Sequence, residues 1–102
     1  MTPWWHYVVA LFAPLFLING IPHTVSGLTG RRFPTPFVGG PPNLDTPPRN
    51  ILWGGGNLVL GGVLLWLVSP SLSNLVIVIE MVIVAWGTAY LLARLFATLK
   101  AN

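Results

Sequence analysis

The chain has 102 residues, of which 54% are hydrophobic and 7% charged, so it has too little polar surface to coat a soluble globular domain. Its net charge of +3 forms no basic face or stripe of the kind that nucleic-acid-binding proteins carry, and the absence of cysteine excludes disulfides, thiolate metal sites and cysteine nucleophiles. Two acidic residues and two histidines leave few candidate metal ligands, so no metal is expected. The composition predicts an integral membrane protein.

Residues 4–21 form the first predicted membrane span. Trp4, Trp5 and Tyr7 are grouped at its beginning, where amphipathic aromatic rings prefer the headgroup zone of a bilayer. Eighteen helical residues rise about 27 Å, enough to cross the hydrocarbon core. The run lacks the basic start of a signal peptide, so we expect it to be retained. His6 lies within the aromatic group; we interpret it as solvated at the interface, with ligand binding as the alternative.

Residues 22–50 are predicted to form a long loop, because seven of the ten prolines lie there and neither helix nor strand can run far through them. Apolar residues alternate with three arginines, which indicates an ordered loop on the headgroup layer rather than a disordered linker. We expect Arg31, Arg32 and Arg49 to contact lipid phosphates, and bound lipid is therefore an expected partner.

Residues 51–69 and 72–96 are the second and third predicted spans, joined by a tight turn into an antiparallel hairpin. Both carry small residues at helical spacing, which let membrane helices approach closely. We interpret them as packing the hairpin on itself, with contact to another copy or another protein as the alternative. The residues concerned are Gly54, Gly61, Gly62, Ala85, Ala89 and Ala93.

The predicted fold class is thus all-α, with three transmembrane helices and a long Pro/Gly-rich loop between the first two. All five Lys and Arg residues fall in that loop or at the end of the third span. Because positive charge is retained on the cytoplasmic side, the sequence predicts the N-terminus outside and the C-terminus inside.

Four polar residues lie within or at the ends of the predicted spans. An acid at the depth of Glu80 is costly, so we consider a hydrogen bond to a neighbouring helix, an inter-subunit salt bridge, or a proton or ion relay. Asn19 and His23 are four residues apart, and Asn57 lies at a comparable depth. We expect these three to form a buried cluster that ties the loop to the helices; a ligand or lipid-headgroup site, and catalysis, are the alternatives.

Three segments carry a family resemblance: Asn19-Gly-Ile-Pro-His23-Thr-Val-Ser-Gly27, Gly30-Arg-Arg-Phe33-Pro-Thr-Pro-Phe37, and Asn50-Ile-Leu-Trp53-Gly with Asn57. They resemble a family of small bacterial integral membrane proteins with Asn-x-x-Pro-His-x-x-Ser-Gly, Gly-Arg-x-Phe-x-x-Pro-Phe and Asn-x-Leu-Trp-Gly-x-x-Asn motifs. The resemblance implies a multi-pass protein of the bacterial inner (cytoplasmic) membrane with an ordered loop, and no activity.

No nucleophile, base and orienting group can be assembled from these residues, so we expect no enzyme and no resident cofactor. The predicted function is a small accessory subunit of a larger bacterial membrane complex, of respiratory, photosynthetic or transport type. One alternative is a homo-oligomeric transporter or channel that uses Glu80. Another is a lipid- or pigment-binding subunit, based on Arg31, Arg32 and the five tryptophans, with His6 or His23 as ligand.

Overall fold

The computed structural model describes residues 1–100, which form three long helices, α1 (Trp4–Leu28), α2 (Pro47–Val68) and α3 (Leu75–Lys100). Two short 3-10 helices, η1 (Pro36–Val38) and η2 (Ser69–Ser71), lie in the connections. Within this range the only β pairing is an isolated antiparallel bridge between Phe33 and Asp45. All three helices are long and apolar enough to cross a membrane, with mean hydropathies of 1.7, 1.8 and 2.2, consistent with a multi-pass membrane protein.

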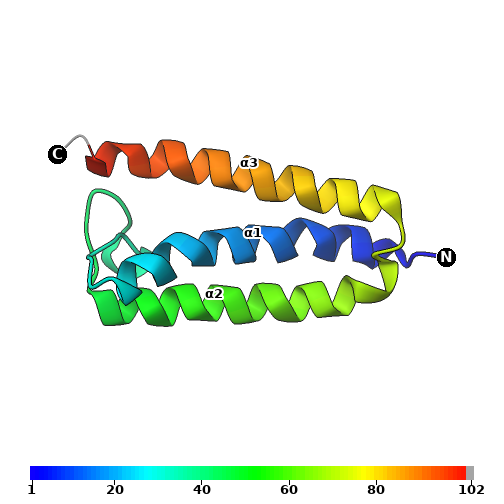
Figure 1. Cartoon of the computed structure of the whole chain (residues 1–102), viewed down its shortest axis with the longest axis horizontal. Helices are drawn as coiled ribbons and strands as arrows, with labels where there is room; N and C mark the ends of the chain where they lie inside the picture. Colours follow the sequence, from blue (N-terminus) through cyan, green and yellow to red (C-terminus); the bar gives the residue numbers. More distant parts are fainter. Residues whose placement is uncertain (101–102) are drawn as a thin grey trace.

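Helix α1 lies between α2 and α3 (Figure 1). It contacts both of them, whereas α2 and α3 make no comparable contact with each other. The N-terminus and the η2 turn lie at one end of the molecule, and the α1–α2 loop lies at the other end with the end of α3. The prediction that the second and third spans pack on each other is therefore wrong, because α1 occupies the space between them.

Glycines allow α1 and α2 to approach closely. A Cβ atom on Gly54 would lie 2.7 Å from the backbone nitrogen of Thr24 and 2.9 Å from the carbonyl oxygen of Gly20, and one on Gly61 would lie 2.9 Å from the backbone nitrogen of Leu17. The small face of α2 thus packs against α1. Gly62 does not share this role, because a Cβ atom there would meet nothing within 4 Å.

The first helix ends later than predicted, at Leu28 instead of Ile21. Pro22 removes one backbone donor, but membrane helices tolerate internal proline where neighbouring groups compensate. The extra turns pack against α2: a Cβ atom on Gly27 would lie 2.7 Å from Cγ1 of Ile51 and 2.8 Å from the carbonyl oxygen of Pro47. Tertiary packing therefore extends the helix beyond the proline.

The other predicted boundaries also shift. Helix α2 begins at Pro47, where the Thr46 hydroxyl accepts a hydrogen bond of 3.4 Å from the Arg49 backbone N–H as N-cap. The connecting loop therefore covers residues 29–46 instead of 22–50. Helix α3 begins at Leu75, not at residue 72, because the η2 turn continues to Asn74, whose side-chain oxygen accepts a 3.0 Å bond from Val76 N–H.

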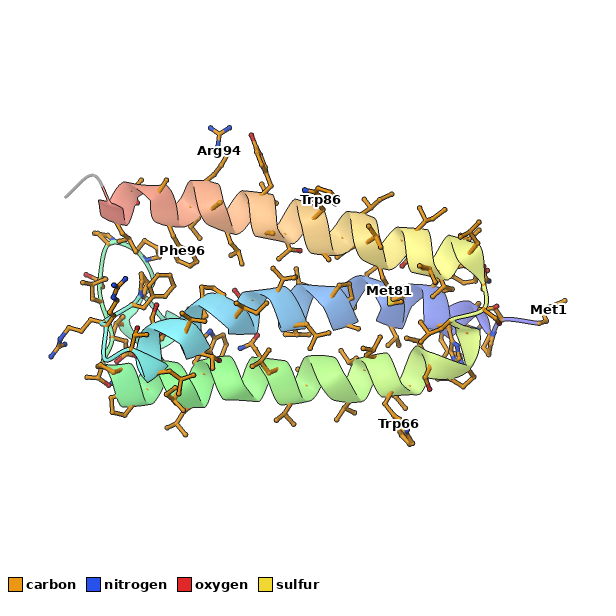
Figure 2. The ribbon with its side chains drawn as sticks, in the orientation of Figure 1. Met1, Trp66, Met81, Trp86, Arg94 and Phe96 are labelled. Atoms are coloured by element: carbon orange, nitrogen blue, oxygen red, sulfur yellow. The ribbon has the colours of Figure 1, made fainter. Side chains whose placement is uncertain are left out.

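Helix α3 is the least buried of the three. Only 6% of its most apolar stretch is buried within the molecule, against 28% for α1 and 22% for α2. Ile77 is its one fully buried large side chain among the described residues. Trp86 and Arg94 point away from the other helices, whereas Phe96 points toward α1 and the loop (Figure 2).

Candidate functional site

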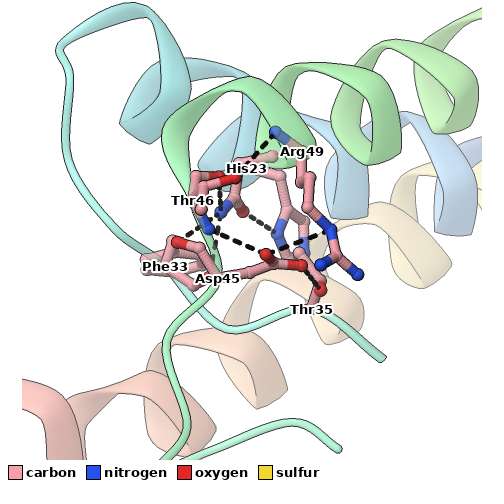
Figure 3. Close-up of polar contacts among 7 residues, drawn as sticks. His23, Phe33, Thr35, Asp45, Thr46 and Arg49 are labelled. Carbon is pink, nitrogen blue, oxygen red and sulfur yellow. Dashed lines mark hydrogen bonds and ion pairs between the residues drawn. The ribbon is translucent and has the colours of Figure 1, made fainter. Parts of the chain in front are cut away.

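Asn50 connects the loop to both α1 and α2. It lies in the first turn of α2, is fully buried, and donates from Nδ2 to the carbonyl oxygens of Phe33 (2.9 Å), Thr46 (3.0 Å) and Asp45 (3.4 Å). Its Oδ1 lies 3.0 Å from Nδ1 of His23 on α1 (Figure 3). One amide side chain thus satisfies backbone groups from both ends of the loop and fixes one histidine.

The Asn50 contacts assign the tautomer of His23. The Asn50 amide nitrogen faces three carbonyl oxygens, so its oxygen must be the atom that faces the imidazole, and Nδ1 of His23 must be the donor. In the neutral ring this leaves Nε2 as an acceptor. The imidazole is 3% exposed, and Nε2 makes no hydrogen bond within the described part of the chain.

Asp45 holds the loop from its second half. Its carboxylate is 2% exposed and accepts hydrogen bonds from the Thr35 hydroxyl and, at 2.8 Å, from the Thr46 N–H. The Thr35 bond, with smaller contributions from Thr46 and the positive charge of Arg49, holds the pKa of Asp45 below its usual value. Arg49 pairs with this carboxylate (3.2 Å) and its guanidinium carbon lies 5.4 Å from the Phe37 ring centroid. One of the three arginines expected on lipid phosphates therefore already has a partner within the chain.

Asn19 and Asn57 form a second bridge between α1 and α2. Asn19 Nδ2 donates to Asn57 Oδ1 at 3.2 Å, and Asn57 Nδ2 donates to the Trp53 carbonyl oxygen at 2.8 Å. The structure thus brings Asn19 to Asn57, but pairs His23 with Asn50 instead of Asn57. Sequence reasoning did not select Asn50 as a site residue, although its spacing of seven from Asn57 places both on one face of α2.

Aromatic rings surround His23. Its ring centroid lies 5.3 Å from that of Phe33, 6.1 Å from Phe96 and 6.5 Å from Trp53, with interplanar angles of 80°, 88° and 86°. Beside these rings is a cavity of about 420 Å³ between the loop and the three helices. Both Asn19 and His23 line it, so two of the polar residues singled out in the sequence face a common space.

A second, apolar groove of about 490 Å³ lies between α1 and α3. Ala89 and Ala93 line it and are exposed, and Ala85 is half-buried on the same helix. This places the alanine face of α3 beside α1 and not against α2. The remaining lining residues are Ile18, Ile21, Pro22, Phe33, Leu92, Phe96 and Ala97.

The other sequence-selected residues lie apart from this site. The interpretation of His6 as solvated at the interface is wrong: the side chain is buried near the N-terminal end, where Nδ1 lies 2.6 Å from the Ser71 hydroxyl. Oε2 of Glu80 is buried and has no hydrogen-bond partner within the described part of the chain. Arg31 and Arg32 are exposed at the loop end, free to face lipid headgroups.

Among the described residues, no three His, Asp or Glu side chains lie close enough to hold a metal ion. The sequence matches no protein-family model, no curated protein and no solved structure.

Proposed function

We propose that this chain is a small, non-catalytic accessory subunit of a larger membrane complex. The family resemblance of residues 19–57 favours the bacterial inner membrane as its location. In this proposal α1, α2 and the loop form a self-contained unit, and α3 is the helix that contacts the partner.

The low burial of α3 is the observation that carries the proposal. With 6% of its apolar stretch buried, α3 has most of its surface free for contacts outside the chain. Its alanines at residues 89, 93 and 97 line an open groove at a spacing of four. Because lipid is as apolar as leucine, membrane helices associate where small side chains permit close approach. A transmembrane helix of a partner protein is the occupant that this surface fits.

Charge supports an orientation for the subunit. Arg31, Arg32 and Arg49 lie in or beside the loop, and Arg94 lies in the half of α3 nearer that end (Figure 2). The N-terminus and the η2 turn, at the opposite end, contain no Lys or Arg. Under the positive-inside rule the loop and the end of α3 are cytoplasmic and the N-terminus is outside.

The test is purification from the native membrane in mild detergent, followed by mass spectrometry of the intact complex. We expect the wild-type chain to co-purify with larger, different subunits. Ala93→Leu fills the groove and should release the chain from them. Gly87→Leu is the matched control, because a Cβ atom on Gly87 meets nothing within 4 Å and this residue does not line the groove. Recovery of the chain alone would overturn the proposal.

Glu80 favours one second candidate, a homo-oligomeric transporter or channel. Its buried Oε2 lacks a hydrogen-bond partner within the described residues, and unpaired acids within membrane spans commonly mark ion or proton pathways. Three helices enclose no pathway, so several copies would be required. A discrete homo-oligomer, with Glu80→Gln abolishing flux into proteoliposomes while the oligomer persists, would favour this function over the accessory role.

A further inference from the structure

The cavity beside His23 presents hydrogen-bond acceptors on its α1 wall. Because Asn57 Nδ2 donates to the Trp53 carbonyl, its Oδ1 is the atom that faces Asn19. Asn19 must then direct its Nδ2 toward Asn57, which leaves its own Oδ1 without a partner within the described residues. One turn further along α1, the Asn50 contact leaves Nε2 of His23 as the second acceptor. Because residues four apart share a helix face, both acceptors lie on the side of α1 that lines this cavity.

The walls of the cavity are aromatic and apolar. Trp53 and Phe96 contribute rings, Leu92 and Leu95 contribute aliphatic surface, and Pro34, Pro36 and Pro41 line it from the loop. No charged side chain lines it within the described residues. An anionic lipid headgroup is therefore a poor occupant, since nothing in the cavity would compensate its charge. An uncharged, flat ring that brings hydrogen-bond donors fits the lining.

The volume of the cavity limits the kinds of ligand that can fit in it. At about 420 Å³ the cavity is at the lower end of the range of about 300–1,000 Å³ typical of small-molecule pockets. A single substituted ring matches this volume, whereas a tetrapyrrole macrocycle is far broader. Leu95 is 49% exposed, so an apolar tail attached to the ring can leave the cavity past this residue into surrounding lipid.

We propose that this cavity binds the hydroquinone head group of a membrane-soluble amphiphile, with ring hydroxyls donating to Nε2 of His23 and Oδ1 of Asn19. The Trp53 indole N–H, which makes no hydrogen bond within the described part of the chain, is available to donate to a hydroxyl oxygen. The oxidised quinone carries carbonyl acceptors in place of these donors, so it meets the two protein acceptors unfavourably. The proposal concerns binding alone and includes no electron transfer. It does not depend on the accessory role.

The first test is ¹⁵N NMR of histidine-labelled protein in lipid nanodiscs under oxygen-free conditions. The chain has two histidines, so His6, bonded to Ser71 at the opposite end, is an internal control. We expect Nε2 of His23 to give the signal of an unprotonated nitrogen and to shift when 2-decyl-1,4-hydroquinone is added, while His6 stays constant. A protonated Nε2, or no shift of His23, would overturn the proposal.

The second test compares affinities of three probes: 2-decyl-1,4-hydroquinone, its 1,4-dimethoxy counterpart and the corresponding quinone. Loss of one hydrogen bond to a buried acceptor is worth about tenfold, and each of the other two probes loses two, so the hydroquinone should bind roughly a hundredfold tighter than either of them. Leu95→Trp, which fills the cavity without touching the Asn50–His23 bond, should weaken hydroquinone binding. Leu91→Trp, on an exposed residue outside the cavity lining, should leave it unchanged.

Three results would contradict the site: equal affinity for all three probes, equal effects of the two tryptophan variants, or a pigment ligated by His23 in the purified protein. The first would show that the acceptors do not select a donor. The second would show that binding occurs elsewhere or through the bilayer. The third would assign the histidine to a different class of ligand.

Discussion

The α1–α2 pair and α3 are both apolar helical units, but they are held to the molecule in different ways. Between α1 and α2, Gly20, Gly54 and Gly61 bring backbones into contact, and Asn19–Asn57 and His23–Asn50 hydrogen bonds cross the interface. The hydrogen bonds and ring contacts that attach helix α3, in contrast, lie at its two ends. Near its start, the Asn74 side chain bonds the hydroxyls of Thr2 and Tyr7, and near its finish Phe96 contacts the rings of Phe33 and His23.

The comparison shows that hydropathy does not decide which membrane helix is most firmly packed. Helix α3 has the highest mean hydropathy of the three, 2.2, and the lowest burial. In lipid, transfer of apolar surface between helices gains little, so close contact and buried hydrogen bonds provide the attachment. The four predictions below test this difference, from the largest expected effect to the smallest.

Gly54→Leu should separate α1 from α2 and prevent native folding. Any side chain at this position meets the Thr24 and Gly20 backbones, which cannot move aside as a flexible side chain can. Gly55→Leu adds the same bulk one residue away, where a Cβ atom meets nothing within 4 Å. The measurement is unfolding of each purified variant by denaturing detergent. Equal stability of the two variants would remove the basis of the comparison.

Asn50→Ala should lower the free energy of unfolding by about 3 kcal/mol, because it leaves the buried Nδ1–H of His23 without a partner and removes the side-chain bonds to the Phe33 and Thr46 carbonyl oxygens, which keep only their backbone N–H partners. Asn43→Ala is the control: Asn43 is exposed and makes one 2.9 Å bond to the Val38 carbonyl, so it should cost under about 1 kcal/mol. Thermal unfolding in detergent measures both. A small effect of Asn50→Ala would show that the loop does not depend on this amide.

Acidification should loosen the loop before it affects the helices. The pKa of Asp45 is lowered by folding, so its stabilising contribution is fully present above its unfolded pKa of about 3.9 and is lost as pH falls through the lower folded value. Tryptophan fluorescence between neutral pH and pH 3 reports the change through Trp53, which contacts Phe37 of the loop. Asp45→Asn should remove this transition; its persistence in the variant would assign the transition to another group.

Ala89→Leu should change the stability of the isolated chain by less than about 0.5 kcal/mol, because Ala89 is exposed beside an open groove. The same substitution at Ala13, which is 0% exposed on α1, should cost about 1–3 kcal/mol by overpacking. Unfolding of both variants in the same detergent tests the prediction. A large loss at Ala89 would mean that α3 is packed more firmly than its burial indicates.

Three apolar helices could be predicted from sequence because each contains a long run of apolar residues, a signal that needs no tertiary context. The spatial order of the helices could not be predicted. Gly54 and Gly61 predict that another helix approaches α2 closely, but they do not indicate which helix. Nothing in the composition distinguishes α1 from α3 as that partner. The end of α1 was missed because a local rule, proline as a helix breaker, competed with packing of Gly27 against Ile51 that only the fold reveals.

Only part of the site could be predicted, because local spacing can be read from the sequence and tertiary pairing cannot. The spacing of four residues predicted that Asn19 and His23 share one helix face. The comparable depth of Asn57 in its own span predicted that it lies near them. The role of Asn50 depends on the return of the loop to α2, where Phe33 and Asp45 pair. No local pattern in a single sequence predicts such a pairing between residues that are far apart along the chain.

The position of α1 between its neighbours also has a consequence for biogenesis. A chain emerges from the ribosome N-terminal end first, so α1, the loop and α2 are complete before α3 is synthesised. The contacts that hold the first pair do not involve α3, and that pair can assemble while α3 is still absent. During that interval the side of α1 that α3 will cover faces lipid or the insertion machinery. The last helix therefore completes a scaffold that is already formed.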